Sequence, residues 1–181
     1  MNVTLNGFMA DMDGGLDWHV QNWTSDMAQL LGQQLRYADT LLLGRNTYSA
    51  MAGYWPAISM SLSIPREDIP YADLINDIKK VVCSSTLKQP GWNNSWVIKG
   101  NLLQQITKLK QQSGKDIMVY GSNTLVQYLI KNNLVDEYIL WTYPIAIAQG
   151  MPLFKYRQSL KLVQSHQFPS GVVVLHYEVV N

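Results

Sequence analysis

The sequence predicts an α/β fold of one domain, in which a mainly parallel, mixed sheet carries helices on both faces and ends in an antiparallel hairpin. Short apolar runs that suit buried strands alternate with amphipathic helical segments through the middle of the chain. Two strand-like segments joined by a Pro-Ser-Gly turn close it. The length of 181 residues fits one domain, and no linker, repeat or low-complexity tract divides it. We therefore expect a single domain over residues 1–181.

The composition indicates a globular protein and argues against several classes of partner. Hydrophobic residues make up 47% of the chain and charged residues 15%, which excludes a disordered protein. The net charge of +1 and the lack of a basic cluster argue against nucleic acid or an anionic membrane as partner. No apolar run approaches the roughly 20 residues that span a bilayer, and the N-terminus has no signal-peptide pattern. A cytoplasmic protein is the expectation.

The sequence offers no pattern for a metal site. Cys83 is the only cysteine, so neither an internal disulfide nor a cysteine-based zinc site can form. The three histidines, His19, His166 and His176, are scattered and suggest no metal triad. We expect no bound metal.

The first elements are a strand and a capped helix. Val3–Ala10 alternates well enough for a strand, and Asp11–Gly15 is a turn cluster. Two tryptophans follow in a loop. Thr24 or Ser25 can cap a helix that runs to about Tyr37, because apolar residues recur there at helical spacing.

The next stretch is a predicted buried strand that leads through a glycine into a helix. Leu41–Leu43 suits a strand buried on both faces, Gly44 ends it, and Tyr48–Ala52 is compatible with a helix. Gly53–Pro70 contains three prolines and several serines, so we expect a surface loop or lid there.

The remaining elements follow from the same patterns. We expect strands at Lys80–Cys83, Ser95–Lys99, Asp116–Tyr120 and Asp136–Tyr143, helices at Tyr71–Ile78, from an Asn101 cap to about Gln112, and from Gly121-Ser122 to about Lys131, and a loop at Gly150–Phe154. Leu160–Gln167 and Val172–Val179 form the terminal hairpin.

Three predicted strands end in small polar residues. These are Gly44-Arg45-Asn46-Thr47, Ser84-Ser85-Thr86 and Gly121-Ser122-Asn123-Thr124. In an open parallel sheet, ligands bind outside the carboxyl ends of the strands. Hydroxyls, glycine N–H groups and one arginine gathered there suit the phosphates of a dinucleotide. Each loop alone is also explained by ordinary turn chemistry, and the chain lacks the Gly-x-Gly-x-x-Gly fingerprint.

The order of these motifs resembles the dihydrofolate reductase-like superfamily, most closely the C-terminal reductase domain of bifunctional riboflavin-biosynthesis enzymes and its stand-alone bacterial relatives. The matching pieces are Thr4–Ala10 with Asp13-Gly14 and Trp18, Leu43–Tyr48, Val81–Leu87, Asp116–Ser122, Leu134–Glu137 with Pro144, and Gly150–Phe154. They span nearly the whole chain in order. The resemblance implies a dihydrofolate reductase-like three-layer fold.

The resemblance also implies an NADPH-dependent oxidoreductase. In this superfamily the glycine–arginine–x–threonine turn, the serine pair and the glycine–serine loop hold NADPH, and the arginine neighbourhood favours NADP over NAD. The cofactor candidates are Gly44, Arg45, Thr47, Ser84, Ser85, Thr86, Gly121, Ser122, Asn123 and Thr124. The related domains pair as homodimers, and the apolar stretch Val172–Leu175 could lie at such an interface.

The predicted substrate side is less specific. Asp26 is a candidate catalytic carboxylate, or else it complements the dipole of its helix. The candidate substrate contacts are Asn6, Asp11, Trp18, Tyr48 and Trp55. Asp11 also suits a plain turn residue, and the three aromatic residues also suit core or lid packing.

Two positions depart from the family pattern. Asn6 stands where the family usually has aspartate, and Ala148 stands where it usually has glycine. Reduction of 5-amino-6-(5-phosphoribosylamino)uracil is one hypothesis, with Arg66 and Lys155 as cations for its phosphate. Dihydrofolate or pteridine reduction is a second. A paralogue that binds NADPH without turnover is a third. We hypothesise that Asn6 marks a changed small-molecule substrate.

Overall fold

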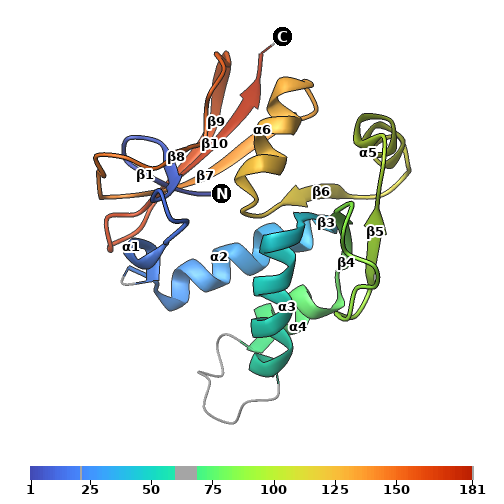
Figure 1. Ribbon diagram of the computed structural model, residues 1–181. Coiled ribbons are helices and arrows are strands. Elements are labelled where there is room, and N and C mark those ends of the chain that lie inside the picture. Colours follow the sequence, from blue (N-terminus) through green and yellow to red (C-terminus); the bar gives the residue numbers. More distant parts are fainter. Residues whose placement is uncertain (21, 60–68, 181) are drawn as a thin grey trace. The chain divides into compact units, whose positions relative to one another are not determined.

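The computed structural model describes residues 1–20, 22–59 and 69–180. Contacts divide the chain into two compact units, of which one is Met1–Thr24 with Asn123–Asn181 and the other is Ser25–Ser122. Figure 1 shows the elements of both units. The assignment of 1–181 to a single domain stays a prediction.

The central unit, Ser25–Ser122, is built on a parallel sheet. Its four strands lie in the order β5-β4-β3-β6, and every neighbouring pair is parallel. The strands are β3 (Ala38–Gly44), β4 (Lys79–Cys83), β5 (Ser95–Ile98) and β6 (Asp116–Val119). The helices are α2 (Ser25–Arg36), α3 (Arg45–Ser59), α4 (Ile69–Asp77) and α5 (Leu102–Lys110), the last capped by Asn101 as predicted.

Alternate residues of the central strands face the helices. Leu41 and Leu43 of β3 and Val82 of β4 pack in one apolar cluster with Leu35 of α2 and Ile75 of α4. The intervening residues of these strands are buried too, so the sheet is covered on both faces. This explains the unbroken Leu-Leu-Leu run.

The expectation of an irregular loop over Gly53–Pro70 is wrong in its first part. Helix α3 continues through Pro56 to Ser59, while residues 60–68, Arg66 included, lie outside the described residues. Proline costs a helical hydrogen bond, but tertiary packing holds this turn. The Trp55 ring meets Tyr71 edge-on at 5.0 Å between centroids, and the Asn76 side chain donates to the Trp55 carbonyl at 3.1 Å.

The second unit, residues 1–24 with 123–181, is called the outer unit because its residues flank 25–122 in the sequence. It has a mixed sheet in the order β1-β7-β10-β9. Strands β1 (Asn2–Thr4) and β7 (Glu137–Tyr143) are parallel, whereas β10 (Val173–Val179) runs antiparallel to β7 and to β9 (Leu160–Gln167). Strands β2 (Phe8–Ala10) and β8 (Met151–Pro152) form a separate antiparallel pair. The helices are α1 (Asp17–Val20) and α6 (Asn123–Lys131).

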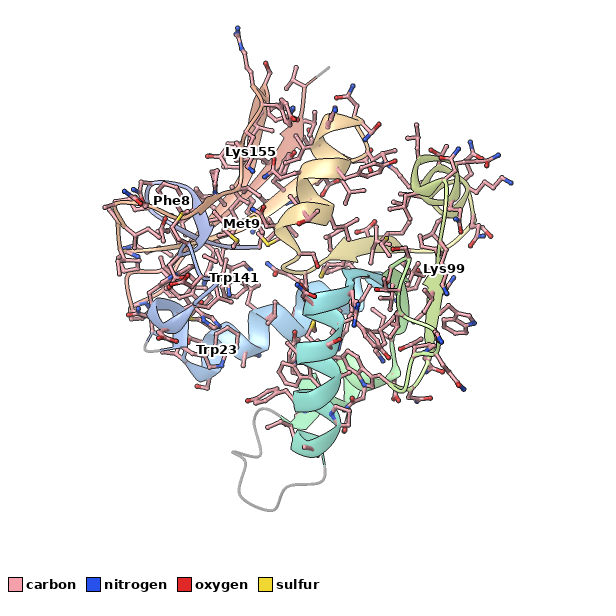
Figure 2. The ribbon with its side chains drawn as sticks, viewed as in Figure 1. Phe8, Met9, Trp23, Lys99, Trp141 and Lys155 are labelled. Atoms are coloured by element: carbon pink, nitrogen blue, oxygen red, sulfur yellow. The ribbon has the colours of Figure 1, made fainter. Side chains whose placement is uncertain are left out.

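The single first strand predicted over Val3–Ala10 is instead two short strands. The chain turns between β1 and β2 at Gly7, whose φ of +84° favours glycine. Trp18 lies in the short helix α1, not in a loop. Trp23 stacks on Trp141 of β7 with ring centroids 6.2 Å apart. Figure 2 labels both residues.

The terminal hairpin of β9 and β10 is confirmed, but its place in the sheet differs from the expectation. Strand β10 lies between β7 and β9, and Val172 and Val174 are buried within the chain. Val172–Leu175 is therefore not an edge. The exposed edge strand is β9, in which Leu162 and Val163 are about half exposed at 50% and 47%.

The predicted fold class is confirmed: an α/β protein with a parallel sheet and antiparallel strands at its C-terminus. One mixed sheet was expected, whereas the described strands pair into three sheets. Strand pairing is set by backbone hydrogen bonds between distant segments, and hydrophobic patterns do not report which strands are neighbours.

Candidate functional site

The three polar loops follow strands of one parallel sheet. Because β3, β4 and β6 are parallel neighbours, their carboxyl ends lie at the same edge. The loop after β4 and the Gly121-Ser122 turn after β6 belong to the central unit. After β3 there is no loop: α3 begins at Arg45 instead of the expected Tyr48, so Arg45-Asn46-Thr47 is the first turn of that helix. Gly44, Ser84 and Gly121 therefore lie at the same edge of the sheet, as the sequence predicted.

Ser122 connects the turn after β6 to the end of β3 and the first turn of α3. Its Oγ accepts the N–H of Gly44 at 2.8 Å and donates to Oγ1 of Thr47 at 2.8 Å. Both Gly121 and Ser122 have positive φ, +53° and +60°, a conformation that costs a serine about 1–3 kcal/mol. A Cβ on Gly121 would lie 3.1 Å from the Thr47 side chain, so glycine permits this close approach.

Arg45 links the first turn of α3 to the loop after β4. Its Nη1 donates to Oγ1 of Thr86 at 2.6 Å. Ser84 folds the second loop, since its Oγ accepts the N–H groups of Thr86 and Leu87 at 3.3 and 3.0 Å. Ser85 is exposed beside them. The guanidinium thus belongs to the first residue of α3, where the helix dipole favours an anion. We call Gly44–Thr47, Ser84–Thr86 and Gly121-Ser122 together the loop cluster; Arg45, Ser85 and Thr86 are its exposed residues on the first two segments, with Asn46.

Asn123 and Thr124 begin α6, in the outer unit. The Asn123 amide donates to the Pro152 carbonyl at 3.2 Å and lies 3.5 Å from Sδ of Met9, which Figure 2 labels. This side chain therefore holds β8 near β2, while Thr124 is exposed. A cofactor contact by either residue stays a prediction.

Two predicted substrate contacts in the outer unit bind their own chain. Asn6 is hydrogen-bonded to the backbone of Ile147 and to Thr4. Asp11 closes the turn before α1, because its Oδ1 accepts the N–H groups of Asp13 at 3.1 Å and Gly15 at 2.6 Å. For Asp11 this is the turn role that the sequence also allowed.

Trp18 packs against Tyr143, a residue that sequence reasoning did not select. Their rings meet edge-on at 5.2 Å between centroids, and His19 also contacts the Tyr143 ring. Neither the Trp18 indole N–H nor the Tyr143 hydroxyl has a hydrogen-bond partner among the described residues, and burial raises the pKa of Tyr143 to about 12. The sequence feature that could have identified Tyr143 as a site residue is its position before Pro144, at the end of a predicted strand.

The other candidates lie in the central unit. Tyr48 is almost wholly buried, and its hydroxyl accepts the N–H of Trp92 at 2.9 Å, so it has the packing role that the sequence allowed. Trp55 is half-buried against Tyr54 and Tyr71. Asp26 lies exposed in the first turn of α2, where its Oδ1 accepts the N–H of Met27 at 3.0 Å. Their substrate and catalytic roles stay predictions.

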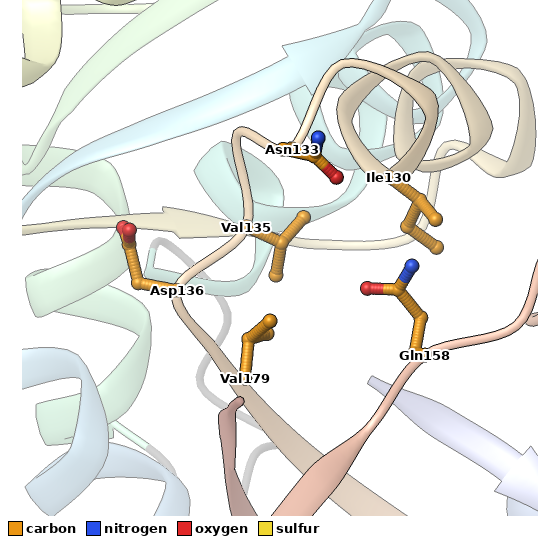
Figure 3. Close-up of a pocket in the computed structure, with 6 residues that line it drawn as sticks. All are labelled: Ile130, Asn133, Val135, Asp136, Gln158 and Val179. Carbon is orange, nitrogen blue, oxygen red and sulfur yellow. The ribbon is translucent and has the colours of Figure 1, made fainter. Parts of the chain in front are cut away.

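A pocket of about 120 Å³ opens in the outer unit, as Figure 3 shows. It is lined by Ile130, Asn133, Val135, Asp136, Gln158 and Val179. None of the predicted site residues lines it, and it lies at the amino end of β7, away from the Tyr143 end. Ligand pockets usually measure about 300–1,000 Å³, so this one is too small for a dinucleotide.

No helix within the described ranges is both long and apolar enough to cross a membrane. Across the same residues, the acidic, histidine and cysteine side chains form no group of three or more that could hold a metal ion. Burial raises the pKa of the Cys83 thiol to about 11, so this cysteine is protonated at neutral pH and is a poor nucleophile.

Comparison with known families gives a match over most of the chain. Residues 1–174 match the family model of the RibD C-terminal domain. The chain is 33% identical over 183 residues to the uncharacterized protein YyaP of Bacillus subtilis, with 97% of this chain and 90% of YyaP covered. It is 28% identical to a second uncharacterized protein of that organism, YwjB, over 97% and 92% of the two chains.

Solved structures with the same fold include a putative riboflavin biosynthesis protein from Shewanella sp. PV-4, at a TM-score of 0.69 and 22% identity over 100% of this chain and 97% of that one. Acinetobacter baumannii RibD matches at 0.66 and 16% identity, over 99% of this chain and 57% of its own. A Thermotoga maritima diaminohydroxyphosphoribosylaminopyrimidine deaminase/5-amino-6-(5-phosphoribosylamino)uracil reductase matches at 0.65 and 13% identity, over 99% and 55%.

Proposed function

The chain belongs to the RibD C-terminal domain family, and from this premise we propose that it is an NADPH-dependent reductase of a small heterocyclic substrate. The family suggests a reaction like the reduction of 5-amino-6-(5-phosphoribosylamino)uracil, which is named for the Thermotoga maritima relative. The family membership confirms the resemblance seen in the sequence. The substrate and the cofactor are the proposed part.

The loop cluster of the central unit is the observation that carries the proposal. Arg45, Thr86, Ser84 and the start of α3 lie at the carboxyl edge of a parallel sheet. This set consists of hydrogen-bond donors and one cation, which suits the phosphates of a dinucleotide. The residues present therefore fit NADPH.

The chain has little acid–base chemistry to supply, because a nicotinamide cofactor provides the hydride. In our proposal Arg45 pairs with the 2′-phosphate, since its planar fork matches phosphate oxygens. Ser122 acts through Gly44 and Thr47, because its hydroxyl already binds both of them. In this proposal Ser122 fixes the backbone where β3 meets α3 and does not itself contact the cofactor.

Two other functions remain as alternatives. One is reduction of dihydrofolate or another pteridine. The other is NADPH binding without turnover, which is the third hypothesis that the replacement at Asn6 raised. Lys155 is exposed after Phe154, and its proposed role toward a substrate phosphate belongs to the riboflavin-type reaction alone. A cytoplasmic location likewise stays a prediction.

Steady-state oxidation of NADPH, followed by its absorbance, distinguishes these functions. The purified protein is supplied in turn with the phosphoribosylaminopyrimidine and with dihydrofolate. The family membership predicts turnover of the pyrimidine and much slower turnover of dihydrofolate. Brisk turnover of the pyrimidine would refute the hypothesis that Asn6 marks a changed substrate. The opposite ranking would favour a pteridine reductase. NADPH binding without turnover of either substrate would favour the non-catalytic alternative, and no NADPH binding at all would refute the proposal.

A further inference from the structure

Asn6 is fixed by three hydrogen bonds, and all of them go to its own chain. Its Nδ2 donates to the carbonyl of Ile147 at 2.8 Å, and its Oδ1 accepts the N–H of Ile147 at 3.3 Å. The same Oδ1 accepts from the Thr4 hydroxyl at 2.9 Å. The amide thus meets both backbone groups of Ile147, as one peptide group meets another in a β-ladder.

Backbone hydrogen bonds continue this contact on both sides of Asn6. The N–H of Leu5 donates to the carbonyl of Ile145 at 2.7 Å, and the N–H of Leu153 donates to the carbonyl of Gly7 at 2.9 Å. Among the contacts of the described residues, the Asn6 side chain makes the only hydrogen bonds to the Pro144–Gly150 segment that lie between the Leu5 and the Gly7 backbone bonds.

We infer that Asn6 is a positioning residue. Its side-chain amide takes the place of a backbone peptide group as the hydrogen-bond partner of Ile147, and it holds the Pro144–Gly150 segment against the turn between β1 and β2. The segment continues the carboxyl end of β7, which runs parallel to β1. Ligands of parallel strands bind outside these ends, so the segment belongs to the substrate side, a point that rests on the proposed function.

The inference requires an amide at this position. An ionised aspartate has only acceptors, and one of its oxygens would face the Ile147 carbonyl without a hydrogen between them. A protonated aspartate has one O–H and restores the donor. Neither Leu5–Gly7 nor Pro144–Gly150 contains a titratable side chain, so an introduced carboxyl would be the one titrating group of the two segments.

The test is the thermal unfolding of wild type and Asn6→Asp between pH 7 and pH 3.5. At pH 7 we expect the variant midpoint to fall by about 3–6 °C, the effect of one or two lost hydrogen bonds in a chain of this size. The native state favours the protonated carboxyl, so its pKa in the folded protein is raised above the usual value near 3.9. The lowered midpoint of Asn6→Asp therefore persists above the folded pKa, and it recovers as pH falls through that pKa toward the usual value.

Two further variants make the result specific. Asn6→Ala cannot donate at any pH, so its deficit should persist to pH 3.5. Gln112→Glu makes the same amide-to-carboxyl change at an exposed residue after α5, and its midpoint should stay within about 1 °C of wild type. An Asn6→Asp protein as stable as wild type at pH 7, or one whose deficit does not close in acid, would overturn the inference.

This unfolding test needs neither cofactor nor turnover, so it fails or succeeds separately from the proposed function. Where NADPH oxidation is measurable, Asn6→Asp should raise the KM for the heterocycle at pH 7 and leave the Kd for NADPH unchanged. A weakened NADPH Kd with an unaltered heterocycle KM would contradict the placement of Asn6 on the substrate side.

Discussion

Lys80 is a fully buried charged residue in the middle of a parallel sheet. Its Nζ donates to the carbonyls of Asn76 and Asn93 and lies 4.3 Å from the centroid of the Trp92 ring. Burial lowers its pKa to about 8, although the charge of Asp77 opposes this shift. Carbonyl oxygens and an aromatic face therefore replace water around this ammonium group.

We predict that Lys80 makes stability rise with pH in mildly alkaline solution. Its folded pKa of about 8 lies below the ordinary value of 10.5, so the unfolded chain binds more protons between these values. The free energy of unfolding then increases with pH, by at most about 1.4 kcal/mol per pH unit. Urea unfolding of wild type and Lys80→Met from pH 7.5 to 9.5 measures this difference.

The matched control is Lys99→Met, which removes an exposed lysine just after β5 (Figure 2). Its stability should follow the wild-type pH dependence, whereas the advantage of wild type over Lys80→Met should grow with pH. Parallel curves for wild type and Lys80→Met would show that Lys80 keeps an ordinary pKa.

Single residues also show where sequence reasoning stopped. The Asn101 cap and the turn role of Asp11 were predictable, because each depends on neighbours within a few positions. The bond from Asn6 to Ile147 spans 141 positions, and Ser122 reaches Gly44 across 78. Contacts at such separations depend on the folded backbone, which residue patterns do not specify.

At the scale of elements, the polar residues that follow three parallel strands were predictable, but the extent of the helices there was not, because α3 begins at Arg45 and α6 at Asn123. Parallel strands always bring their carboxyl ends together, so the loop cluster followed once β3, β4 and β6 were recognised. Helix α3 passes through Pro56 because Trp55 packs against Tyr71 and bonds to Asn76. Local proline rules do not include such tertiary support.

Strand β9 bears on the assembly of the protein. It is an edge of its sheet, seven of its eight residues are exposed, and Leu162 and Val163 are each about half exposed. An exposed edge strand with apolar side chains invites pairing with another chain. We propose that the protein is a homodimer and that β9, rather than Val172–Leu175, lies at its interface.

Sedimentation velocity tests this proposal. Wild type should sediment as a dimer at tens of micromolar, and Leu162→Asp should shift the protein toward monomer, since a charge in the interface is left unpaired. Leu103→Asp changes a similarly exposed leucine on α5 and should leave the dimer intact. A wild-type protein that is monomeric at high micromolar concentration would refute the homodimer.

At the scale of the whole molecule, the predictions divide along the two compact units. The cofactor candidates before Asn123 lie in the central unit, where a regular parallel sheet made the loops predictable. The outer unit contains Asn6 and Tyr143, where short strands, a separate β2–β8 pair and long-range bonds prevail. The strand pairing and the long-range hydrogen bonds of the outer unit could therefore not be predicted from the sequence.

We propose that the loop cluster binds NADPH and that Arg45 recognises its 2′-phosphate. The most direct measurement is the affinity of wild type and Arg45→Ala for NADPH and NADH, followed by tryptophan fluorescence. We expect wild type to bind NADPH more tightly than NADH. In Arg45→Ala that preference falls by about 1.5–3 kcal/mol, or roughly 10- to 150-fold, the contribution of a hydrogen bond between charged groups.

Arg157→Ala removes the same charge from an exposed position in the outer unit and should retain the wild-type preference. Loss of preference in Arg45→Ala but not in Arg157→Ala is the predicted result. Equal affinities of wild type for NADPH and NADH, or a preference that survives in Arg45→Ala, would show that Arg45 does not recognise the 2′-phosphate.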